Sequence, residues 1–353
     1  MNELFDVNKF IGKSSKWLNG NGKNSDIIIS TRIRLARNLR GFRFTNCPVN
    51  KELEEIIDSV KKAIVNSDFI NEMEFIKLHS ISDLDREFLV ERHLISPFCA
   101  KMNTPRAIFI GKGEFYSIVI NEEDHLRIQS IQSGLDVENA WENIKKIDDV
   151  LKENVRYAYT DELGYLTACP TNTGTGMRVS FFCHLPGIVL TKRLEEFLDK
   201  WIPAGITVRG FYGEGTDAMG NIFQVSNQIT LGISEKDTIA KIKNVAKRFV
   251  QFEKESREKL MNEDRIQVED KVERAKAILQ NAKIIPSLEF MSLLSAIRLG
   301  VDLKILKRIQ RKILNELMII VQPAHIQKFK GKKLNELERD ILRAEIIKSK
   351  INF

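Results

Sequence analysis

Residues 106–121 read RAIFIGKGEFYSIVIN and contain two short apolar runs, at 106–111 and 115–121. Isoleucine, valine and phenylalanine dominate both runs, and these residues suit the pleated surface of a β-sheet. Only the tripeptide Lys-Gly-Glu at 112–114 separates the runs, which is the length of a hairpin connection. Strands joined in this way pair antiparallel, so the stretch predicts an antiparallel sheet rather than a doubly wound parallel one.

The sequence on both sides of this hairpin supplies the rest of the sheet and the helices that cover it. Further strand-like runs lie at 27–34, 74–79, 126–132, 177–184, 206–211 and 222–232. Helices with apolar residues at three- and four-residue spacing are expected at 51–66, 83–92, 136–154 and 190–200. This order predicts the α+β class, with helices flanking an antiparallel sheet.

The chain changes character after Glu235. Residues 236–353 hold 27 lysines and arginines against 16 aspartates and glutamates, but only two of the 19 glycines. Ser234 begins a capping-box pattern that opens a long helix. Helices are expected at 235–261, 265–281, 287–299, 302–319 and 334–349. We therefore predict two domains, an α+β body at 1–255 and an all-α domain at 256–353.

The composition excludes several classes of protein. The chain has 353 residues, 29% of them charged, and no run of 18 apolar residues, so no membrane span is expected. The first residues lack the apolar core of a secretory signal. The four cysteines form no CxxC pair, which argues against a zinc site or a disulfide framework and favours the cytoplasm.

Five arginines lie on or beside predicted strands: Arg32, Arg34, Arg127, Arg178 and Arg209. Arg32 and Arg34 are two residues apart, so their side chains project from one face of a strand. Arginine stays charged, and its planar fork binds two phosphate oxygens at once. A solvated or ion-paired role would explain any single one, but five on core strands indicate a phosphate site. Such a site needs no Walker loop, and the sequence has neither that loop nor the HRD and DFG motifs of protein kinases.

Carboxylates and one cysteine accompany these arginines. Glu122, Glu123 and Asp124 are consecutive, and Glu214 stands between two glycines, which permits a tight loop close to a ligand. Cys169 precedes a loop rich in threonine and glycine, where hydroxyl and backbone N–H groups favour a thiolate. The other cysteines, Cys47, Cys99 and Cys183, are interpreted as small core residues.

Four segments carry a resemblance to a known family. They are STRIRLARN at 30–38, NEEDHLR at 121–127, CPTNTGTGMR at 169–178 and RGFYGEG at 209–215. Their types and order resemble the phosphagen (ATP:guanido) phosphotransferases, such as creatine and arginine kinases. The resemblance extends from about Ser25 to Ile233. One departure, Thr173 where the family signature has an aliphatic residue, leaves the reactive positions intact.

Two further features resemble one branch of that family, the bacterial protein-arginine kinases. Only some 25 residues precede the first motif, where small-guanidine kinases carry a helical domain, and a basic helical domain follows the sheet. Arg339, Asp340 and Arg343 fit the RDxxRA motif that forms a phosphoarginine-binding allosteric site in that branch. As a bare pattern the motif is also compatible with charges on a helix surface.

The resemblance implies that the chain transfers the ATP γ-phosphoryl group to arginine side chains of proteins. In this interpretation Glu123 and Glu214 orient the guanidinium group and accept its proton, and Cys169 aligns it as a thiolate. Mg²⁺ bridges the phosphates and needs no dedicated protein site. The implied ATP-binding residues are Ser30, Thr31, Arg32, Ile33, Arg34, His93, Arg127, Arg178, Val179, Ser180, Phe181, Phe182, Arg209, Gly210, Phe211, Tyr212, Gly213 and Glu214.

The resemblance also implies a cellular setting. Phosphorylation would mark proteins for regulated proteolysis in a stress response, with a heat-shock repressor, a zinc-containing activator protein and an AAA+ unfoldase–protease as partners. An apolar stripe along 293–317 is either domain core or the seam of a homodimer or higher homo-oligomer.

Other functions stay open at this stage. A small-molecule guanidino kinase and a non-catalytic phosphoarginine-binding adaptor are the alternatives. Direct nucleic-acid binding is not expected, because the basic tail lacks interleaved aromatic residues and alternates its charges.

Overall fold

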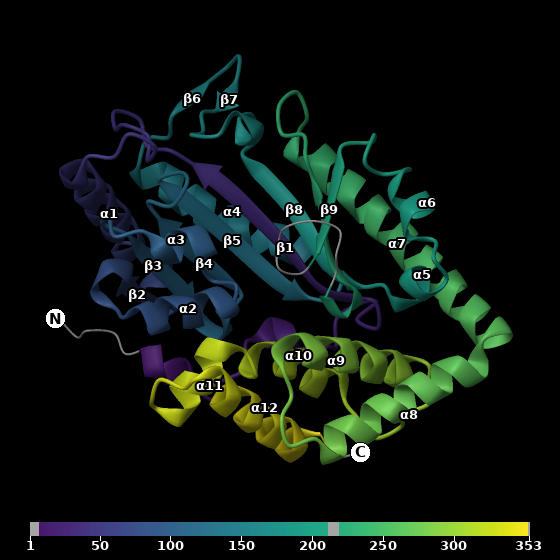
Figure 1. Cartoon of the computed structure of the whole chain (residues 1–353). Helices are drawn as coiled ribbons and strands as arrows, with labels where there is room; N and C mark the ends of the chain where they lie inside the picture. Colours follow the sequence, from purple (N-terminus) through teal and green to yellow (C-terminus); the bar gives the residue numbers. More distant parts are fainter. Residues whose placement is uncertain (1–6, 211–218, 352–353) are drawn as a thin grey trace.

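A computed structural model describes residues 7–210 and 219–351 of the chain. Its centre is an eight-stranded sheet in the order β2-β3-β4-β5-β1-β8-β10-β9, with antiparallel neighbours throughout (Figure 1). Its strands are β1 (Ile28–Arg37), β2 (Met73–Lys77), β3 (Ala107–Gly111), β4 (Tyr116–Ile120), β5 (Leu126–Ser133), β8 (Met177–His184), β9 (Ile206–Gly210) and β10 (Ile222–Asn227). A separate hairpin consists of β6 (Tyr159–Thr160) and β7 (Gly164–Tyr165). The predicted antiparallel α+β fold is confirmed.

The hairpin that predicts the fold is β3–β4, and its connection is a short 3-10 turn at Lys112–Glu114. Gly113 sits there with φ 73°, a left-handed conformation that glycine adopts without a Cβ penalty. Glu114 is buried and pairs with the buried Arg92, so an ion pair also stabilises this turn.

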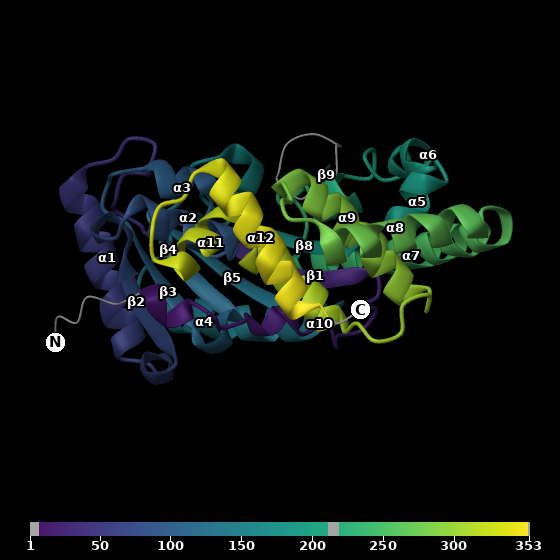
Figure 2. The same cartoon turned by 60° about the horizontal axis from the view of Figure 1, so that its bottom comes forward.

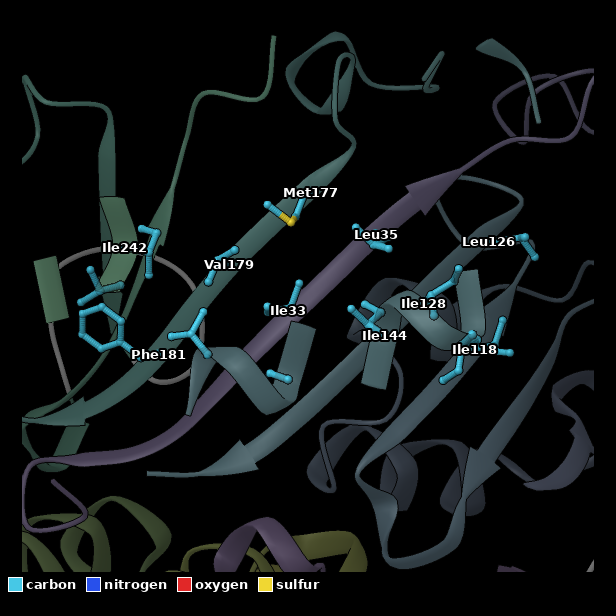
Figure 3. Packing of buried hydrophobic residues seen from close by; sticks show 14 of the residues in the cluster. Ile33, Leu35, Ile118, Leu126, Ile128, Ile144, Met177, Val179, Phe181 and Ile242 are labelled. Atoms are coloured by element: carbon cyan, nitrogen blue, oxygen red, sulfur yellow. The ribbon is translucent and has the colours of Figure 1, made fainter. Parts of the chain in front are cut away.

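Helices cover one face of the sheet and enclose the main core. They are α1 (Asn50–Val65), α4 (Val137–Asn154) and the first turns of α7 (Glu235–Glu263). Strand residues that point to this side, such as Ile33, Val179 and Phe181, pack against Ile144 of α4 and Ile242 of α7 (Figure 3). Apolar burial of this size is the dominant stabilising term of the fold.

Shorter elements lie at the ends of the sheet. The short helices are α2 (Asp83–Glu91), α3 (Pro97–Lys101), α5 (Pro186–Leu190) and α6 (Leu194–Leu198). The 3-10 turns are η1 (Val7–Phe10), η2 (Lys16–Asn19), η3 (Asp68–Asn71), η4 (Leu78–Ser80), η5 (Lys112–Glu114), η6 (Pro170–Asn172) and η7 (Met219–Asn221). Ser82 caps α2 through a full capping box.

The C-terminal helices form a second apolar core against one end of the sheet (Figures 1 and 2). They are α8 (Arg265–Asn281), α9 (Ser287–Asp302), α10 (Arg311–Ile320), α11 (Pro323–Lys330) and α12 (Glu336–Lys350). Trp17 of η2 and Phe182 of β8 belong to the same core. Among the helices that the structure describes, none is both long and apolar enough to cross a membrane.

Three predicted elements differ from the structure. β10 ends at Asn227 rather than at 232, because the Asn227 side chain takes up backbone groups, accepting from Val179 N (2.7 Å) and donating to Met177 O (3.1 Å). The helix expected at 302–319 begins only at Arg311, because the chain turns at Lys304 (φ 63°). The helix expected at 190–200 is interrupted at Lys192 (φ 56°).

Helix α11, a separate helix after Pro323, was not predicted. The predicted domain boundary between residues 255 and 256 falls within the continuous helix α7, and the division into 1–255 and 256–353 stays a prediction.

Candidate active site

The register of three central strands gathers the predicted arginines on one face of the sheet. Arg34 on β1 lies opposite Arg178 on β8, and Arg32 lies opposite Ser180. On the other side of β1, Ala36 faces Arg127 of β5. Arg209 of β9 pairs with Gln224, which in turn pairs with Phe182 of β8. Since residues opposite each other in a ladder share a face, all five arginines lie on the face away from α4 and α7.

Two adjoining cavities open on this arginine face. The first, about 220 Å³, is lined by Arg32, Arg34, Arg127 and His93, and on its far wall by residues of the C-terminal domain. The second, about 80 Å³, is lined by Arg34, Arg127 and Arg178 together with the carboxylate turn 122–124. Because Arg34 and Arg127 line both, the two cavities lie side by side on the arginine face.

The arginines carry like charges and repel one another, and few carboxylates lie among them to compensate this repulsion. Burial, with Arg127 and Arg178 close by, lowers the pKa of Arg32 to about 9. Burial and the same neighbours hold the pKa of Arg34 well below its ordinary value. Neither Arg34 nor Arg178 has an ion-pair partner among the residues that the structure describes. A bound anion with several negative charges would relieve this repulsion.

Among the residues that the structure describes, Glu122 is the buried carboxylate that pairs with an arginine of the cluster. Both of its oxygens lie 2.6 Å from Arg127 Nη1. Burial alone would lower the pKa of Arg127, but this ion pair raises it, and the pKa of Glu122 is correspondingly lowered. Glu122 therefore holds Arg127 in place, and its neighbour Glu123 stays exposed at the cavity wall.

Asp124 connects the carboxylate turn to the cysteine loop, defined here as residues 169–176. Its Oδ1 accepts hydrogen bonds from Asn38 Nδ2 (2.6 Å) and from the backbone N–H of Ala168 (2.7 Å). Asn38 Oδ1 accepts from His125 N (2.8 Å), which closes the network. Asp124 is buried, and burial raises its pKa. One buried carboxylate thus fixes Glu123 and Cys169 relative to each other.

Cys169 is half-buried and precedes the turn η6. Its Sγ lies 3.0 Å from Thr171 Oγ1, and its carbonyl accepts from Thr167 Oγ1 (2.8 Å). Burial lowers the pKa of Arg178, whereas Glu123 and Cys169 both act to raise it, so these two groups lie within electrostatic range of the same guanidinium. The structure therefore brings Glu123, Cys169 and Arg178 together.

Glycine is required twice where the cysteine loop turns. Gly174 (φ 114°) lies against the carbonyl of Thr230, and Gly176 (φ 60°) lies against that of Ala36. A Cβ at either position would meet backbone atoms that cannot move aside.

His93 lines the larger cavity in a left-handed conformation (φ 60°). Its ring contacts Trp17 edge-on, with centroids 5.8 Å apart, and Phe182, with centroids 5.4 Å apart. Burial, with Arg32 nearby, lowers the pKa of His93 to about 3, so the ring is neutral at physiological pH.

Several residues of the predicted ATP site are placed differently from the arginines. The side chains of Ile33, Val179 and Phe181 lie in the core on the opposite face (Figure 3). Thr31 also points away, and its hydroxyl donates to Gly134 O (2.7 Å). Strand alternation is the reason, since a contiguous strand segment exposes only every second side chain to one face. The side chains of these four residues therefore do not line the cavities, and their assignment to the ATP site stays a prediction.

The other members of that set fall into three groups. Ser30, Ser180 and Phe182 lie on the arginine face, whereas Arg209 is exposed on β9 and Gly210 ends that strand. Four members, Phe211, Tyr212, Gly213 and Glu214, lie outside the described residues. One cysteine needs correction: Cys47 is exposed in the loop between β1 and α1, whereas Cys99 and Cys183 are buried as expected.

The RDxxRA residues lie apart from the sheet, on α12. Arg343 is buried and donates to Val321 O (2.9 Å) and Ile285 O (2.8 Å), and it also pairs with Asp340. Arg339 donates to Leu334 O (3.0 Å). These arginines therefore have protein partners, unlike Arg34.

The far wall of the larger cavity was not predicted from the sequence. Met318 and Ile319 of α10 and Gln322 before α11 line it, so the C-terminal domain contributes to the site. Arg343 of α12 donates to the carbonyl of Val321, and the next residue, Gln322, lines the cavity. The hydrogen bond therefore connects α12 to the cavity wall. Asn38 and Gln129 were also missed, although Asn38 stands at the end of the first motif.

Comparisons with known proteins agree with this geometry. Residues 55–256 match the family described as "ATP:guanido phosphotransferase, C-terminal catalytic domain", and residues 265–353 match "Protein-arginine kinase McsB C-terminal domain". A protein named protein-arginine kinase from Halothermothrix orenii is 43% identical over 96% of this chain and 97% of its own length. One of that name from Bacillus cereus is 44% identical over 96% of both chains.

Two solved structures share the fold. Lombricine kinase superposes with a TM-score of 0.59 at 25% identity, over 67% of this chain and 68% of its own. The substrate-free duplicated taurocyamine kinase from Schistosoma mansoni gives a TM-score of 0.57 at 27% identity, over 72% of this chain. This chain spans about a third of that duplicated protein, 36% of its length.

Proposed function

The chain belongs to the protein-arginine kinases within the ATP:guanido phosphotransferase family, and on this premise we propose how its own residues act on ATP and on the arginine side chains of proteins. The observation that carries the proposal is the cluster of four arginines around two adjoining cavities, with Glu123 on the wall of the smaller cavity and Cys169 within electrostatic range of Arg178.

The arginine face is the proposed site for the phosphates of ATP. Arg32, Arg34, Arg127 and Arg178 are fixed by the strands that carry them, and an excess of positive charge is built in before any ligand arrives. Charge that is already in position stabilises a transferring phosphoryl group without reorganisation. Arg209, at the exposed edge, would close the cluster on the solvent side.

The larger cavity is the proposed site for the nucleoside. His93 is neutral there and lies between Trp17 and Phe182, while Met318 and Ile319 supply an apolar wall. A flat, partly apolar cavity joined to a cationic one matches the two ends of a nucleoside triphosphate.

The guanidinium group of the substrate would bind beside the carboxylate turn. Glu123 orients it and accepts one N–H proton as the new N–P bond forms and the bond to ADP breaks. Cys169, as a thiolate, would contact the same group and align the attacking nitrogen. We assign Glu214 the second carboxylate role from its motif alone, because it lies outside the described residues.

Mg²⁺ is the implied companion of ATP. Among the described residues there is no group of three or more His, Cys, Asp or Glu side chains placed to hold a metal ion. The residues fit a magnesium ion held mainly through phosphate oxygens and water, as magnesium commonly is. When bound, the ion would neutralise charge on the phosphates.

The α12 arginines are the proposed site for phosphoarginine. Arg339, Asp340 and Arg343 carry the motif, and the bonds of Arg343 to Val321 O and Ile285 O would have to be exchanged for bonds to the ligand. We further propose a role in regulated proteolysis during stress, a cytoplasmic location, a homodimer or higher homo-oligomer, and the repressor, activator and unfoldase–protease partners.

The test is incubation with Mg·ATP and an arginine-rich protein, followed by mass spectrometry under non-acidic conditions. Acid-labile phosphate on arginine is expected from the wild type and not from Cys169→Ala. Phosphate on serine, threonine or tyrosine would refute the proposal. Phosphorylation of free arginine alone would instead identify a small-molecule kinase, and binding of phosphoarginine without any transfer would identify an adaptor.

A further inference from the structure

A large cavity among the described residues lies outside the site discussed above. It measures about 880 Å³ and is formed between the β6–β7 hairpin, the end of α4 and the start of α7. Figure 1 places this hairpin at the opposite end of the sheet from the C-terminal helices. No residue of the RDxxRA motif or of the arginine cluster lines it.

The cysteine loop is a wall between this cavity and the candidate active site. Gly174 and Thr175 line the large cavity, whereas Asn172 and Gly176 of the same loop line the cavity that contains Glu123. The loop is fixed from the side of the large cavity, since Gly174 exchanges backbone hydrogen bonds with Tyr165 and Thr175 N donates to Thr230 O (3.0 Å). A chain seated in the cavity would therefore lie against Gly174 and Thr175, in the same loop that begins with Cys169.

The cavity surface combines exposed apolar side chains with cations. Tyr159, Leu163 and Leu231 are 53%, 41% and 51% exposed, although each is large and apolar. The clustering of such residues in one concave surface is typical of a contact site.

Cations outnumber free anions around this surface. Arg40, Lys152 and Arg156 are exposed lining residues, and none of them has a carboxylate within ion-pair distance in the described part of the chain. Of the two lining carboxylates, Glu235 lies 3.9 Å from the buried Arg37, and only Glu162 is without such a pair there. The cavity therefore favours a ligand that is apolar and negatively charged.

We propose that this cavity is a docking site for the polypeptide that flanks the target arginine, and that it selects apolar and acidic residues there. The inference rests on the proposed kinase function, because it requires an arginine that reaches Cys169. The large cavity and the cavity that contains Glu123 lie on the two sides of one loop, so residues close to the target arginine in the substrate would be the ones to reach the large cavity. Contacts remote from the reacting group would then add to the affinity for protein substrates.

Two peptides of thirteen residues with one central arginine test the proposal. One has glutamate and leucine flanks, and the other has lysine and leucine flanks. Fluorescence anisotropy without ATP gives their dissociation constants. The wild type is expected to bind the glutamate peptide about tenfold more tightly, and the double variant Lys152→Glu, Arg156→Glu is expected to reverse this order. Leu231→Asp should weaken both peptides.

Lys271→Glu is the matched control, because Lys271 is an equally exposed cation on α8, far from the hairpin. It should leave the preference unchanged. Equal binding of both peptides by the wild type, or a preference that survives the double variant, would overturn the docking site.

A second readout separates this proposal from the kinase function. Phosphorylation of the same peptides should follow the binding order in kcat/KM, with the KM for ATP unchanged in every variant. Binding that responds to the double variant without any phosphorylation of arginine contradicts the kinase proposal and leaves the docking site standing. Phosphorylation of arginine with a preference that is the same in wild type and double variant supports the kinase proposal and contradicts the docking site.

Discussion

Arg34 and Arg37 lie on the same strand but differ in their partners. Arg37 points into the helix-covered side, where Asp148 accepts from Nη2 (3.0 Å) and Nε (3.2 Å), and two backbone carbonyls accept from Nη1 at 2.9 Å. Arg34 points to the other face, where its buried Nε has no hydrogen-bond partner among the described residues. Arg343 on α12 resembles Arg37, since protein groups satisfy it.

The difference shows what each arginine contributes. A partnered, buried arginine stabilises the fold, and removing it leaves carbonyls and a carboxylate unsatisfied. An arginine held among other arginines opposes folding, and the fold tolerates it only where other interactions outweigh the repulsion. Such a cluster is prepared for a ligand that brings the missing negative charge.

The largest expected effect is on catalysis by the sheet arginines. Arg34→Met should lower kcat/KM by about 10³-fold, because a positioned arginine contributes that much to phosphoryl transfer. Its free energy of unfolding without nucleotide should stay the same or rise, because repulsion from Arg32, Arg127 and Arg178 is removed. Steady-state kinetics and urea unfolding measure the two effects.

Arg37→Met is the control on the same strand and should behave in the opposite way. It should lose about 3 kcal/mol of stability, because it breaks a buried ion pair. If Arg34→Met destabilised the protein as strongly as Arg37→Met, the distinction between the two kinds of arginine would be wrong.

The second prediction concerns α12. Arg343→Met should cost about 2–4 kcal/mol of stability, because Val321 O, Ile285 O and Asp340 lose their partner. Arg339→Met, whose arginine makes one hydrogen bond to Leu334 O, should cost less than 1 kcal/mol. Chemical denaturation compares the two. A stability loss that is equal in both variants would show that the bonds of Arg343 to Val321 O and Ile285 O do not stabilise the unliganded fold more than the bond of Arg339.

The third prediction concerns Asp124, a positioning residue. Asp124→Ala should lower kcat by about 10²-fold with little change in the KM for ATP, because the cysteine loop and the carboxylate turn lose their common anchor. Asp124→Asn keeps an oxygen that can accept from Ala168 N, so it should retain most of the activity. Equal losses in both variants would mean that the charge, and not the anchoring bond, is what matters.

At neutral pH the smallest effect is expected at His93, whose pKa is lowered by burial and by the nearby Arg32. Its pKa in the folded protein is about 3, below that of an unfolded histidine, so the unfolded chain takes up a proton first as the pH falls. Folding stability due to His93 is therefore present above about pH 6.5 and is lost toward pH 3, at roughly 1 kcal/mol per pH unit. His93→Gln should remove this part of the acid dependence.

The same histidine responds to the proposed ligand. Binding of triphosphate to the arginine face should raise the pKa of His93, which NMR titration of its ring can follow. A pKa that is unaffected by saturating ATP would place the phosphates elsewhere.

Much of the site was available from the primary structure. The hairpin at 106–121 predicted antiparallel pairing because short apolar runs with a three-residue link leave few other arrangements. The i, i+2 spacing of Arg32 and Arg34 predicted a shared face, and β1 places them so. The carboxylate turn and Cys169 were identified because their residue types match the chemistry of a guanidinium group.

Other features depend on contacts that no local pattern reveals. Contiguous motif segments suggested that Ile33 and Val179 take part in the site, but alternation turns their side chains into the core. Met318, Ile319 and Gln322 reach the cavity only because the C-terminal helices fold back onto the sheet (Figure 2). The Asn227 side chain ends β10 through contacts with β8, a strand far away in the sequence. The break before α10 includes a left-handed turn at Lys304 that the helical pattern did not reveal.

The amino-acid sequence alone determined which chemical groups are present, the alternation that places them on strand faces, and the order of the elements, because these depend on residue type and local spacing. Only the tertiary structure decided which arginines are neutralised. Whether a guanidinium meets a carboxylate, a carbonyl or another guanidinium depends on strand register and on the packing of α12, and both are fixed by contacts between residues far apart in the chain.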